Sequence, residues 1–200
     1  MEIKLGKHSA LVGFALAVCL LIGCGSGKQS EKDQLADTLT YRAHTSLLRA
    51  YDRLGSATFA TNFYWWDSTG QVRELRESFG SVIFIYFWQT ASKPSVDGLR
   101  DLSELQKKYR DSGLVVVGIP FKEPGTHTEA INRVVDLTAS LQVDIPQILG
   151  TNELAATYGG IDAIPTTIIV NRKGQVRNTI LGAKPKAVVE AEIREALTKN

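Results

Sequence analysis

The chain has 200 residues, of which 44% are hydrophobic and 22% are charged, so it is long enough for one globular domain with additional segments. Its 23 basic and 21 acidic residues nearly cancel, to a formal net charge of +2. This balance gives no electrostatic support for nucleic-acid binding, and we expect no nucleic-acid partner.

The first residues have the pattern of an export signal. Lys4 and Lys7 precede an apolar stretch, residues 10–22, which is shorter than the roughly 20 apolar residues that a transmembrane helix needs. The stretch ends in Leu-Ile-Gly-Cys, which resembles the lipobox of bacterial lipoproteins. We therefore predict a signal peptide over residues 1–23 and a lipid anchor on Cys24. A plain signal peptide or an uncleaved anchor helix are the alternatives.

Cysteine usage follows from this interpretation. The chain contains two cysteines, Cys19 and Cys24. Cys19 would leave with the signal peptide and lipidation would block the thiol of Cys24, so the mature domain is expected to hold no disulfide and no free thiol. An exported domain meets an oxidising environment, so the compartment does not explain the missing disulfide. Gly25, in place of an aspartate after the cysteine, favours the outer membrane in a cell with two membranes.

Residues 24–57 are predicted to form a tether followed by an amphipathic helix. Residues 25–32 are polar and contain glycine, as a flexible tether does. Between residues 33 and 54, apolar side chains recur mostly at steps of three and four, which predicts a helix. These positions are Leu35, Leu39, Ala43, Leu47, Leu48, Tyr51 and Leu54. The globular domain is expected to span residues 58–200.

The next elements combine a hairpin with a strand-and-helix pair. Residues 58–66 are rich in aromatic and β-branched residues, and the turn-forming residues 67–70 precede a short second strand, so a β-hairpin is predicted. Residues 82–88 form a continuous apolar run, as in a buried central strand. Residues 94–109 are predicted to be helical, with one apolar face.

The rest of the chain continues the alternation of strands and helices. We predict strands at 114–119, 145–149, 166–170 and 175–181, and helices at 127–141, 152–158 and 185–197. Strands 166–170 and 175–181 form a hairpin around the turn 171–174. This order predicts an α/β sheet with a crossover connection and an antiparallel edge.

Residues 88–95 carry the most informative motif. They read W-Q-T-A-S-K-P-S and join the apolar strand 82–88 to the helix 94–109. A strand that delivers a W-x-x-x-C-x-P-C turn onto a helix N-terminus is the active-site pattern of thioredoxin-like disulfide oxidoreductases. Ser92 and Ser95 stand at the two cysteine positions, so the frame is complete and both sulfur atoms are missing.

Residues 59–197 resemble the TlpA/ResA branch of the thioredoxin-like family, the membrane-tethered thiol-disulfide proteins of bacterial envelopes. Three stretches carry the resemblance: the hairpin at 59–75, the strand and turn at 82–95, and residues 158–175, which read Y-G-G-I-D-A-I-P-T-T and end in N-R-K-G-Q. The resemblance implies a thioredoxin-like fold, in which helices flank a central mixed sheet and an N-terminal β-hairpin is added.

The same resemblance implies a peptide-binding groove. It implies a cis peptide bond before Pro165, and a loop whose exposed backbone pairs with an extended substrate peptide. The expected groove residues are Trp88, Lys93, Pro94, Ile164, Pro165 and Thr166.

Disulfide exchange by the family mechanism needs a thiolate at the first cysteine position and a second thiol that resolves the mixed disulfide. A serine hydroxyl is far less acidic and forms no S–S bond, so no catalytic residue is expected at Ser92 or Ser95. Ser92 is instead expected to cap the helix, which is worth about 1 kcal/mol relative to alanine. A catalytic serine would need a base, and neither His44 nor His127 lies in a recognisable triad motif. We expect no metal and no cofactor.

Three functional hypotheses follow. The favoured one is a lipid-anchored, redox-inactive thioredoxin-like protein of the cell envelope that binds a peptide or protein noncovalently. The second is that the native gene encodes an oxidoreductase, and the serine pair is an engineered or strain-specific replacement. The third is a structural spacer in an envelope complex, with the helix predicted at 33–54 as its docking element.

Overall fold

The computed structural model describes residues 45–47, 50–52, 59–67 and 69–199. The predicted signal peptide, Cys24 and the tether lie outside these residues. The elements are β1 (Thr45–Leu47), β2 (Ala50–Asp52), β3 (Asn62–Trp66), β4 (Val72–Glu74), η1 (Leu75–Ser78), β5 (Val82–Trp88), α2 (Lys93–Tyr109), η2 (Arg110–Ser112), β6 (Leu114–Pro120), α3 (His127–Ser140), β7 (Gln147–Leu149), α4 (Asn152–Thr157), β8 (Thr166–Val170), β9 (Val176–Leu181) and α5 (Lys186–Thr198).

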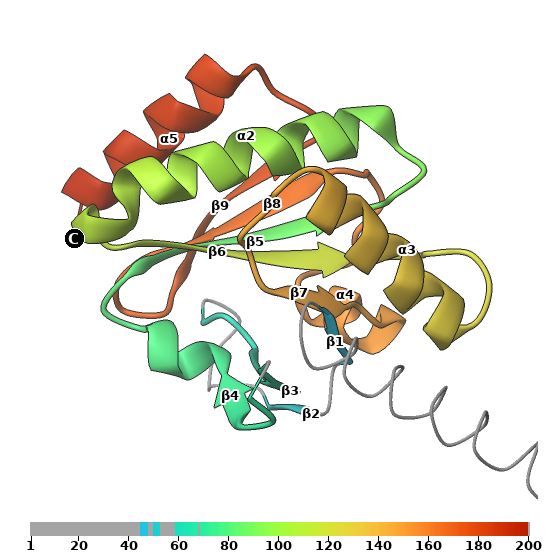
Figure 1. The fold of residues 1–200 in the computed structure, drawn as a ribbon. Helices are drawn as coiled ribbons and strands as arrows, with labels where there is room; N and C mark the ends of the chain where they lie inside the picture. Colours follow the sequence, from blue (N-terminus) through green and yellow to red (C-terminus); the bar gives the residue numbers. More distant parts are fainter. Residues whose placement is uncertain (1–44, 48–49, 53–58, 68, 200) are drawn as a thin grey trace, which may run out of the picture. The chain divides into compact units, whose positions relative to one another are not determined.

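A six-stranded mixed sheet forms the centre of the described residues, in the order β1-β7-β6-β5-β8-β9 (Figure 1). Strands β1, β7, β6 and β5 pair in parallel, whereas β8 is antiparallel to both β5 and β9. From β5 onward, every predicted strand and helix is present, with ends that differ by one or two residues. The predicted α/β fold with a mixed sheet and an antiparallel edge is confirmed.

The N-terminal hairpin is also confirmed. Strands β3 and β4 pair antiparallel, and β2 joins β3 to complete a three-stranded sheet. The turn is closed by two backbone hydrogen bonds of 2.9 Å, from the Asp67 N–H to the Gln71 carbonyl and from the Gly70 N–H to the Asp67 carbonyl. The Asp67 carboxylate also accepts the backbone N–H of Thr69 at 2.9 Å, a frequent role for aspartate in turns.

The helix predicted over residues 33–54 is wrong for its described residues. Residues 45–47 form β1, which pairs in parallel with β7, and residues 50–52 form β2, which pairs with β3. The other residues of the predicted helix lie outside the described part of the chain. The spacing of apolar residues was compatible with a helix, but edge pairing with β7 and β3 overrides that local pattern.

The core lies on both faces of β5, whose seven residues are all buried. Alternate side chains point to opposite faces, as the pleat of a strand requires. Ile83, Ile85 and Phe87 pack with residues of β3, η1 and α4, whereas Phe84, Tyr86 and Trp88 pack with residues of α2, α3 and α5. Burial on both faces explains why this segment is a continuous apolar run.

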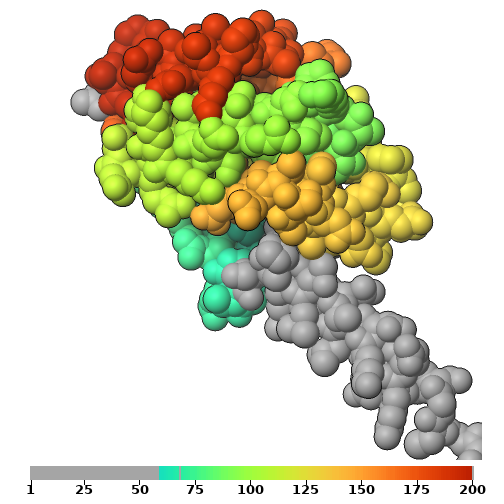
Figure 2. All heavy atoms as spheres, turned by 45° about the horizontal axis from the view of Figure 1, so that its top comes forward, coloured from blue at the N-terminus to red at the C-terminus, as the bar shows by residue number. Residues whose placement is uncertain are grey.

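Helix α2 carries the candidate site at its first turn and is fixed along its length by its apolar face. Leu99, Leu102 and Leu105 are buried against the sheet, at the spacing expected of an amphipathic helix. Helix α5 lies beside α2, as Figure 2 shows for the red and green segments. The Glu190 carboxylate of α5 joins the two helices, because it accepts the Tyr109 hydroxyl at 2.6 Å.

Candidate functional site

The candidate site lies at the end of the sheet where strand β5 finishes and strand β8 starts. The two strands are antiparallel, and their register pairs Phe87 with Thr166. Pro165 directly precedes Thr166, and Trp88 directly follows Phe87. The turn after β5 and the loop before β8 therefore leave the sheet at the same end of these two strands. Backbone pairing thus brings the two predicted site segments together.

Ser92 caps helix α2, as expected. Its backbone is extended, with φ −97° and ψ 104°, and its Oγ accepts the backbone N–H of Ser95 at 3.4 Å. Pro94 lies in the first helical turn and is exposed, a position where its missing N–H costs no helical hydrogen bond. The site thus has a capped helix N-terminus, and the capping residue Ser92 is partly exposed.

Ser95 has a different environment, because it is fully buried in the first turn of α2. Its hydroxyl oxygen has no hydrogen-bond partner among the described residues. The Tyr86 hydroxyl lies beneath this turn and donates to the backbone carbonyl of Ser95 at 2.9 Å. Burial raises the pKa of Tyr86, and the carboxylates of Asp101 and Asp97 add to that shift, so the phenol remains a donor at neutral pH.

The unpartnered hydroxyl predicts a stabilising substitution. Ser95→Ala is expected to raise the free energy of unfolding by about 1 kcal/mol, because it removes a buried polar atom that makes no hydrogen bond. Chemical denaturation of the two proteins measures the difference. Ser103→Ala is the matched control, since the buried Ser103 Oγ accepts the Asp144 N–H at 3.4 Å. That control should lower the stability, and an equal loss in both variants would show that the Ser95 hydroxyl is satisfied.

The loop before β8 forms the other half of the site. The peptide bond between Ile164 and Pro165 is cis. The Pro165 carbonyl accepts the Gly182 N–H at 2.8 Å, and the Thr166 hydroxyl donates to the Ala163 carbonyl at 2.7 Å. Pro165 and Thr166 are buried, whereas Ile164 is half-buried. The first bond joins the loop to the residue after β9, and the second lies within the loop itself.

A small hollow of about 20 Å³ lies between α2 and this loop. Gly98 of α2 lines it opposite Pro165, with Gly182 and Lys184 at the end of β9. A Cβ atom on Gly98 would lie 2.4 Å from the Tyr86 hydroxyl oxygen, so Gly98 lets α2 approach the tyrosine closely. Residues of α2 and of the Pro165 loop therefore line one small space.

Trp88 requires a correction, since its side chain is 0% exposed and cannot offer its ring to a partner. Its indole N–H donates to Gln147 Oε1 at 2.9 Å, and the Gln147 amide donates in turn to the Ile145 carbonyl at 3.0 Å. Strand position explains the result, because Trp88 is the last residue of β5 and points to the α2 face. Trp88 therefore supports the site from within the core.

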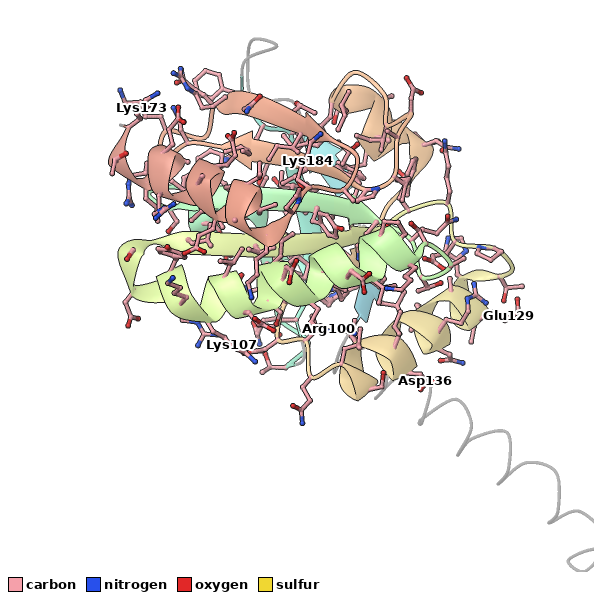
Figure 3. All side chains as sticks on the ribbon, turned by 90° about the horizontal axis from the view of Figure 1, so that it is seen from above. Arg100, Lys107, Glu129, Asp136, Lys173 and Lys184 are labelled. Carbon is pink, nitrogen blue, oxygen red and sulfur yellow. The ribbon has the colours of Figure 1, made fainter. Side chains whose placement is uncertain are left out.

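Two lysines carry positive charge around the site, Lys93 and Lys184. Lys93, the first residue of α2, forms an i,i+4 ion pair with Asp97, and its hydrogen bond lowers the pKa of that carboxyl group. Both side chains are exposed, so this pair contributes little to stability. Lys184, labelled in Figure 3, lies in the loop between β9 and α5 and adds a positive charge near Pro165.

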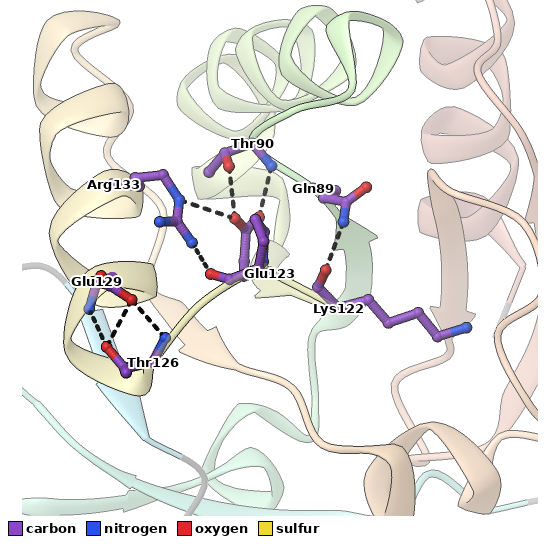
Figure 4. Close-up of polar contacts among 8 residues, drawn as sticks. Gln89, Thr90, Lys122, Glu123, Thr126, Glu129 and Arg133 are labelled. Carbon is purple, nitrogen blue, oxygen red and sulfur yellow. Dashed lines mark hydrogen bonds and ion pairs between the residues drawn. The ribbon is translucent and has the colours of Figure 1, made fainter.

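Sequence reasoning missed Glu123, which lies in the loop between β6 and α3. Both of its carboxylate oxygens accept hydrogen bonds from Thr90 in the turn after β5, each at 2.6 Å (Figure 4). The same loop, with residues 149–153, lines a pocket of about 510 Å³ at the carboxyl ends of β6 and β7. No motif marks a loop glutamate, and only the parallel pairing of β5 and β6 reveals that it contacts the turn.

The arrangement offers little for chemistry at Ser92. The bond shown for its hydroxyl oxygen is the helix cap, and no hydrogen bond joins it to His127. His127 instead begins α3 and lines the separate pocket beside Glu123. Among the described residues, no group of three or more metal-binding side chains occurs. The same residues include no helix with the length and hydropathy that crossing a bilayer requires.

Comparison with known proteins gives consistent results. Residues 57–179 match the AhpC/TSA family. The chain is 30% identical over 148 residues to the thiol-disulfide oxidoreductase ResA of Halalkalibacterium halodurans, which covers 74% of this chain and 77% of that one. It is 26% identical over 136 residues to ResA of Bacillus thuringiensis subsp. konkukian, with coverage of 68% and 75%.

Solved structures show the same fold. A thioredoxin-family thiol:disulfide interchange protein from Chlorobium tepidum superposes with a TM-score of 0.62 at 23% identity, covering 72% of this chain and 99% of that one. A secreted thiol-disulfide isomerase from Corynebacterium glutamicum gives a TM-score of 0.57 at 16% identity, with coverage of 76% and 99%. At these identities the likeness establishes the thioredoxin-like fold alone.

Proposed function

The chain belongs to the AhpC/TSA family as a TlpA/ResA-like member, and on this basis we propose that it is a redox-inactive protein that binds a peptide or protein noncovalently beside Pro165. One observation carries the proposal: Ser92 and Ser95 occupy the first turn of α2, where disulfide exchange would need two thiols. Hydroxyl groups at these positions cannot form or break a disulfide bond.

The surroundings of the two serines support a role in binding rather than a site that has lost all function. Helix α2 begins at Lys93, one residue before the predicted start, Ser92 caps it, and residues of α2 and of the Pro165 loop line the same hollow. No hydrogen bond joins the backbone of Ile164 to another described residue. Its N–H and carbonyl groups are therefore available to an extended peptide, which would bind by strand addition.

Location follows from the lipobox-like sequence before Cys24. The proposal includes export and a lipid anchor on Cys24, which would place the domain outside the cytoplasm of a bacterial cell. In a cell with two membranes, the anchor would lie in the outer membrane. The partner would then be a protein or peptide of the cell envelope. Metabolic labelling with a fatty-acid analogue tests the anchor, because Cys24→Ser should abolish the labelling.

Crosslinking in cells tests the binding function. The full chain, tagged at its C-terminus, would be crosslinked and its captured proteins identified by mass spectrometry. Ala91→Arg places a long charged side chain on an exposed position beside Ser92, so it should reduce capture of the specific partner at least about tenfold through steric and charge repulsion. Because Ala91 is exposed, the substitution should leave the thermal unfolding midpoint unchanged.

Ala139→Arg is the matched control for that experiment. Ala139 is exposed near the end of α3. Its replacement by arginine makes the same change in size and charge as Ala91→Arg, but away from the site. Capture should survive it. Equal capture by the parent and both variants would overturn the proposed site and move binding to another surface. Reduction of insulin disulfides by the unaltered chain above the buffer rate would overturn redox inactivity.

A further inference from the structure

Glu123 is an acidic side chain in an unusual place, buried against the turn that leads to Ser92. Its side chain is 3% exposed. One carboxylate oxygen accepts the Thr90 backbone N–H at 2.6 Å and the other accepts the Thr90 hydroxyl at 2.6 Å (Figure 4). The two bonds fix both the backbone and the side chain of Thr90, two residues before the helix cap.

The carboxylate is only partly compensated by positive charge. Arg133 Nε lies 3.7 Å from Glu123 Oε2, beyond a hydrogen bond, and this Nε is buried without a hydrogen-bond partner among the described residues. Another nitrogen of the same guanidinium donates to the Pro124 carbonyl. Burying a carboxylate is costly, and a buried ion pair is weak evidence for a gain in stability. A role in fixing one conformation of the turn accounts for this placement better.

Further bonds join the same two segments. The Gln89 side-chain amide donates to the Lys122 carbonyl at 2.6 Å, and the Phe121 N–H donates to the Trp88 carbonyl at 2.8 Å. Lys122 adopts a φ of 56°, a backbone conformation that is uncommon for a non-glycine residue. This change in the direction of the backbone comes directly before Glu123. Residues 88–90 and 121–123 thus form one hydrogen-bonded unit.

We propose that Glu123 is a positioning residue, which holds the turn from Thr90 to Ser92 in the geometry that the partner recognises. The inference rests on the proposed binding function for its purpose, but the geometric effect can be measured without any partner. Glu123 would act through Thr90, and the residues that contact the partner would be those beside Ser92 and Ile164.

Amide hydrogen exchange on the full chain tests the first step. Glu123→Ala should raise the exchange rate of the Thr90 amide at least about tenfold, because that N–H loses its buried acceptor. Glu123→Gln retains an acceptor oxygen and should restore most of the protection. Glu129→Ala is the matched control, since Glu129 caps α3 in the same region by accepting the Thr126 N–H at 2.7 Å. It should leave the Thr90 amide protected.

A disulfide reporter tests whether the turn geometry itself depends on Glu123. Ser92→Cys and Ser95→Cys are introduced in a full chain whose Cys19 and Cys24 are replaced by serine. The ratio of disulfide to dithiol is then measured at equilibrium in a glutathione buffer, and Glu123→Gln separates the effect of removing the charge from the effect of removing the hydrogen-bond acceptor. This ratio reports how closely the turn holds the two sulfur atoms.

Glu123→Ala is expected to lower the ratio of disulfide to dithiol about tenfold, and Glu123→Gln to remain within about threefold of the parent. An unchanged ratio with Glu123→Ala would overturn the proposal. An equal fall with Glu129→Ala would overturn it too, because the effect would then be general destabilisation. Partner capture in cells is a separate measurement, so loss of the binding function and loss of the positioning role are distinguishable.

Discussion

Replacing both site serines with cysteine is expected to give this chain disulfide reductase activity. Ser92→Cys combined with Ser95→Cys should raise insulin reduction from the buffer rate to at least about a hundred times that rate. The measurement uses the full chain with Cys19 and Cys24 replaced by serine, so that the introduced thiols are the only ones.

The expected gain follows from the geometry of the first turn of α2. Position 92 caps the helix and is partly exposed, so a thiol there would lie at the positive end of the helix dipole, which lowers a thiol pKa. Position 95 is buried one turn later, and its side chain has no hydrogen-bond partner in the described part of the chain, so a thiol there would leave no strong donor unsatisfied. The two positions therefore suit an attacking thiol and a resolving thiol.

Single variants separate the two roles. Ser92→Cys alone should form mixed disulfides without turnover, because no second thiol releases the substrate. Ser95→Cys alone should remain unreactive, because the position is buried. The double variant could form its disulfide and still reduce insulin no faster than buffer. That result would show that the site lacks other features, besides the two sulfur atoms, that disulfide reduction requires.

Trp88→Ala is expected to lower the free energy of unfolding by about 3–5 kcal/mol, the range found when a large buried aromatic side chain is truncated. Trp88 is fully buried between β5 and α2, so the substitution leaves a cavity in the core. It also removes the donor to Gln147 Oε1, which leaves a buried amide oxygen unpaired and adds to the loss. Urea denaturation monitored by circular dichroism measures the change.

The packing around Gln147 limits any relaxation of that cavity. A Cβ atom on Gly118 would lie 2.1 Å from Gln147 Oε1, so the glutamine fills the space that the absent side chain leaves. Trp88→Phe is the informative control, because it keeps most of the volume and removes only the hydrogen bond. It should cost about 1–3 kcal/mol. If Trp88→Ala lowered the free energy of unfolding by less than about 1 kcal/mol, the result would contradict the buried position of Trp88. It would indicate instead that the side chain is exposed at the site.

Local sequence patterns predicted most of the fold because they report burial directly. The apolar run at β5 is buried on both faces, and the apolar stripe of α2 faces the sheet, so each pattern corresponds to one element. The motif at residues 88–95 also predicted the cap at Ser92, since a serine before a proline-containing first turn is a local signal. None of these features depends on distant residues.

The failures share a different cause. Residues 45–47 and 50–52 are strands because β7 and β3 offer edges to pair with, and a periodicity argument cannot see those edges. Trp88 was expected at the surface because the motif shows which residue adjoins the turn and not which face it occupies. Glu123 carried no signal at all, because its partner Thr90 lies 33 residues away in the sequence.

The sequence by itself determined the order of strands and α-helices from the N-terminal hairpin onward, the family resemblance and the absence of thiols at positions 92 and 95. Those properties depend on residue type and on spacing over one or two turns. The tertiary structure decided that the Ser95 hydroxyl is buried without a hydrogen-bond partner among the described residues, that Trp88 lies in the core, and that Glu123 accepts hydrogen bonds from Thr90 in the turn before Ser92. Each of these depends on which strands pair and in which register, and that pairing places side chains from distant segments within hydrogen-bond distance.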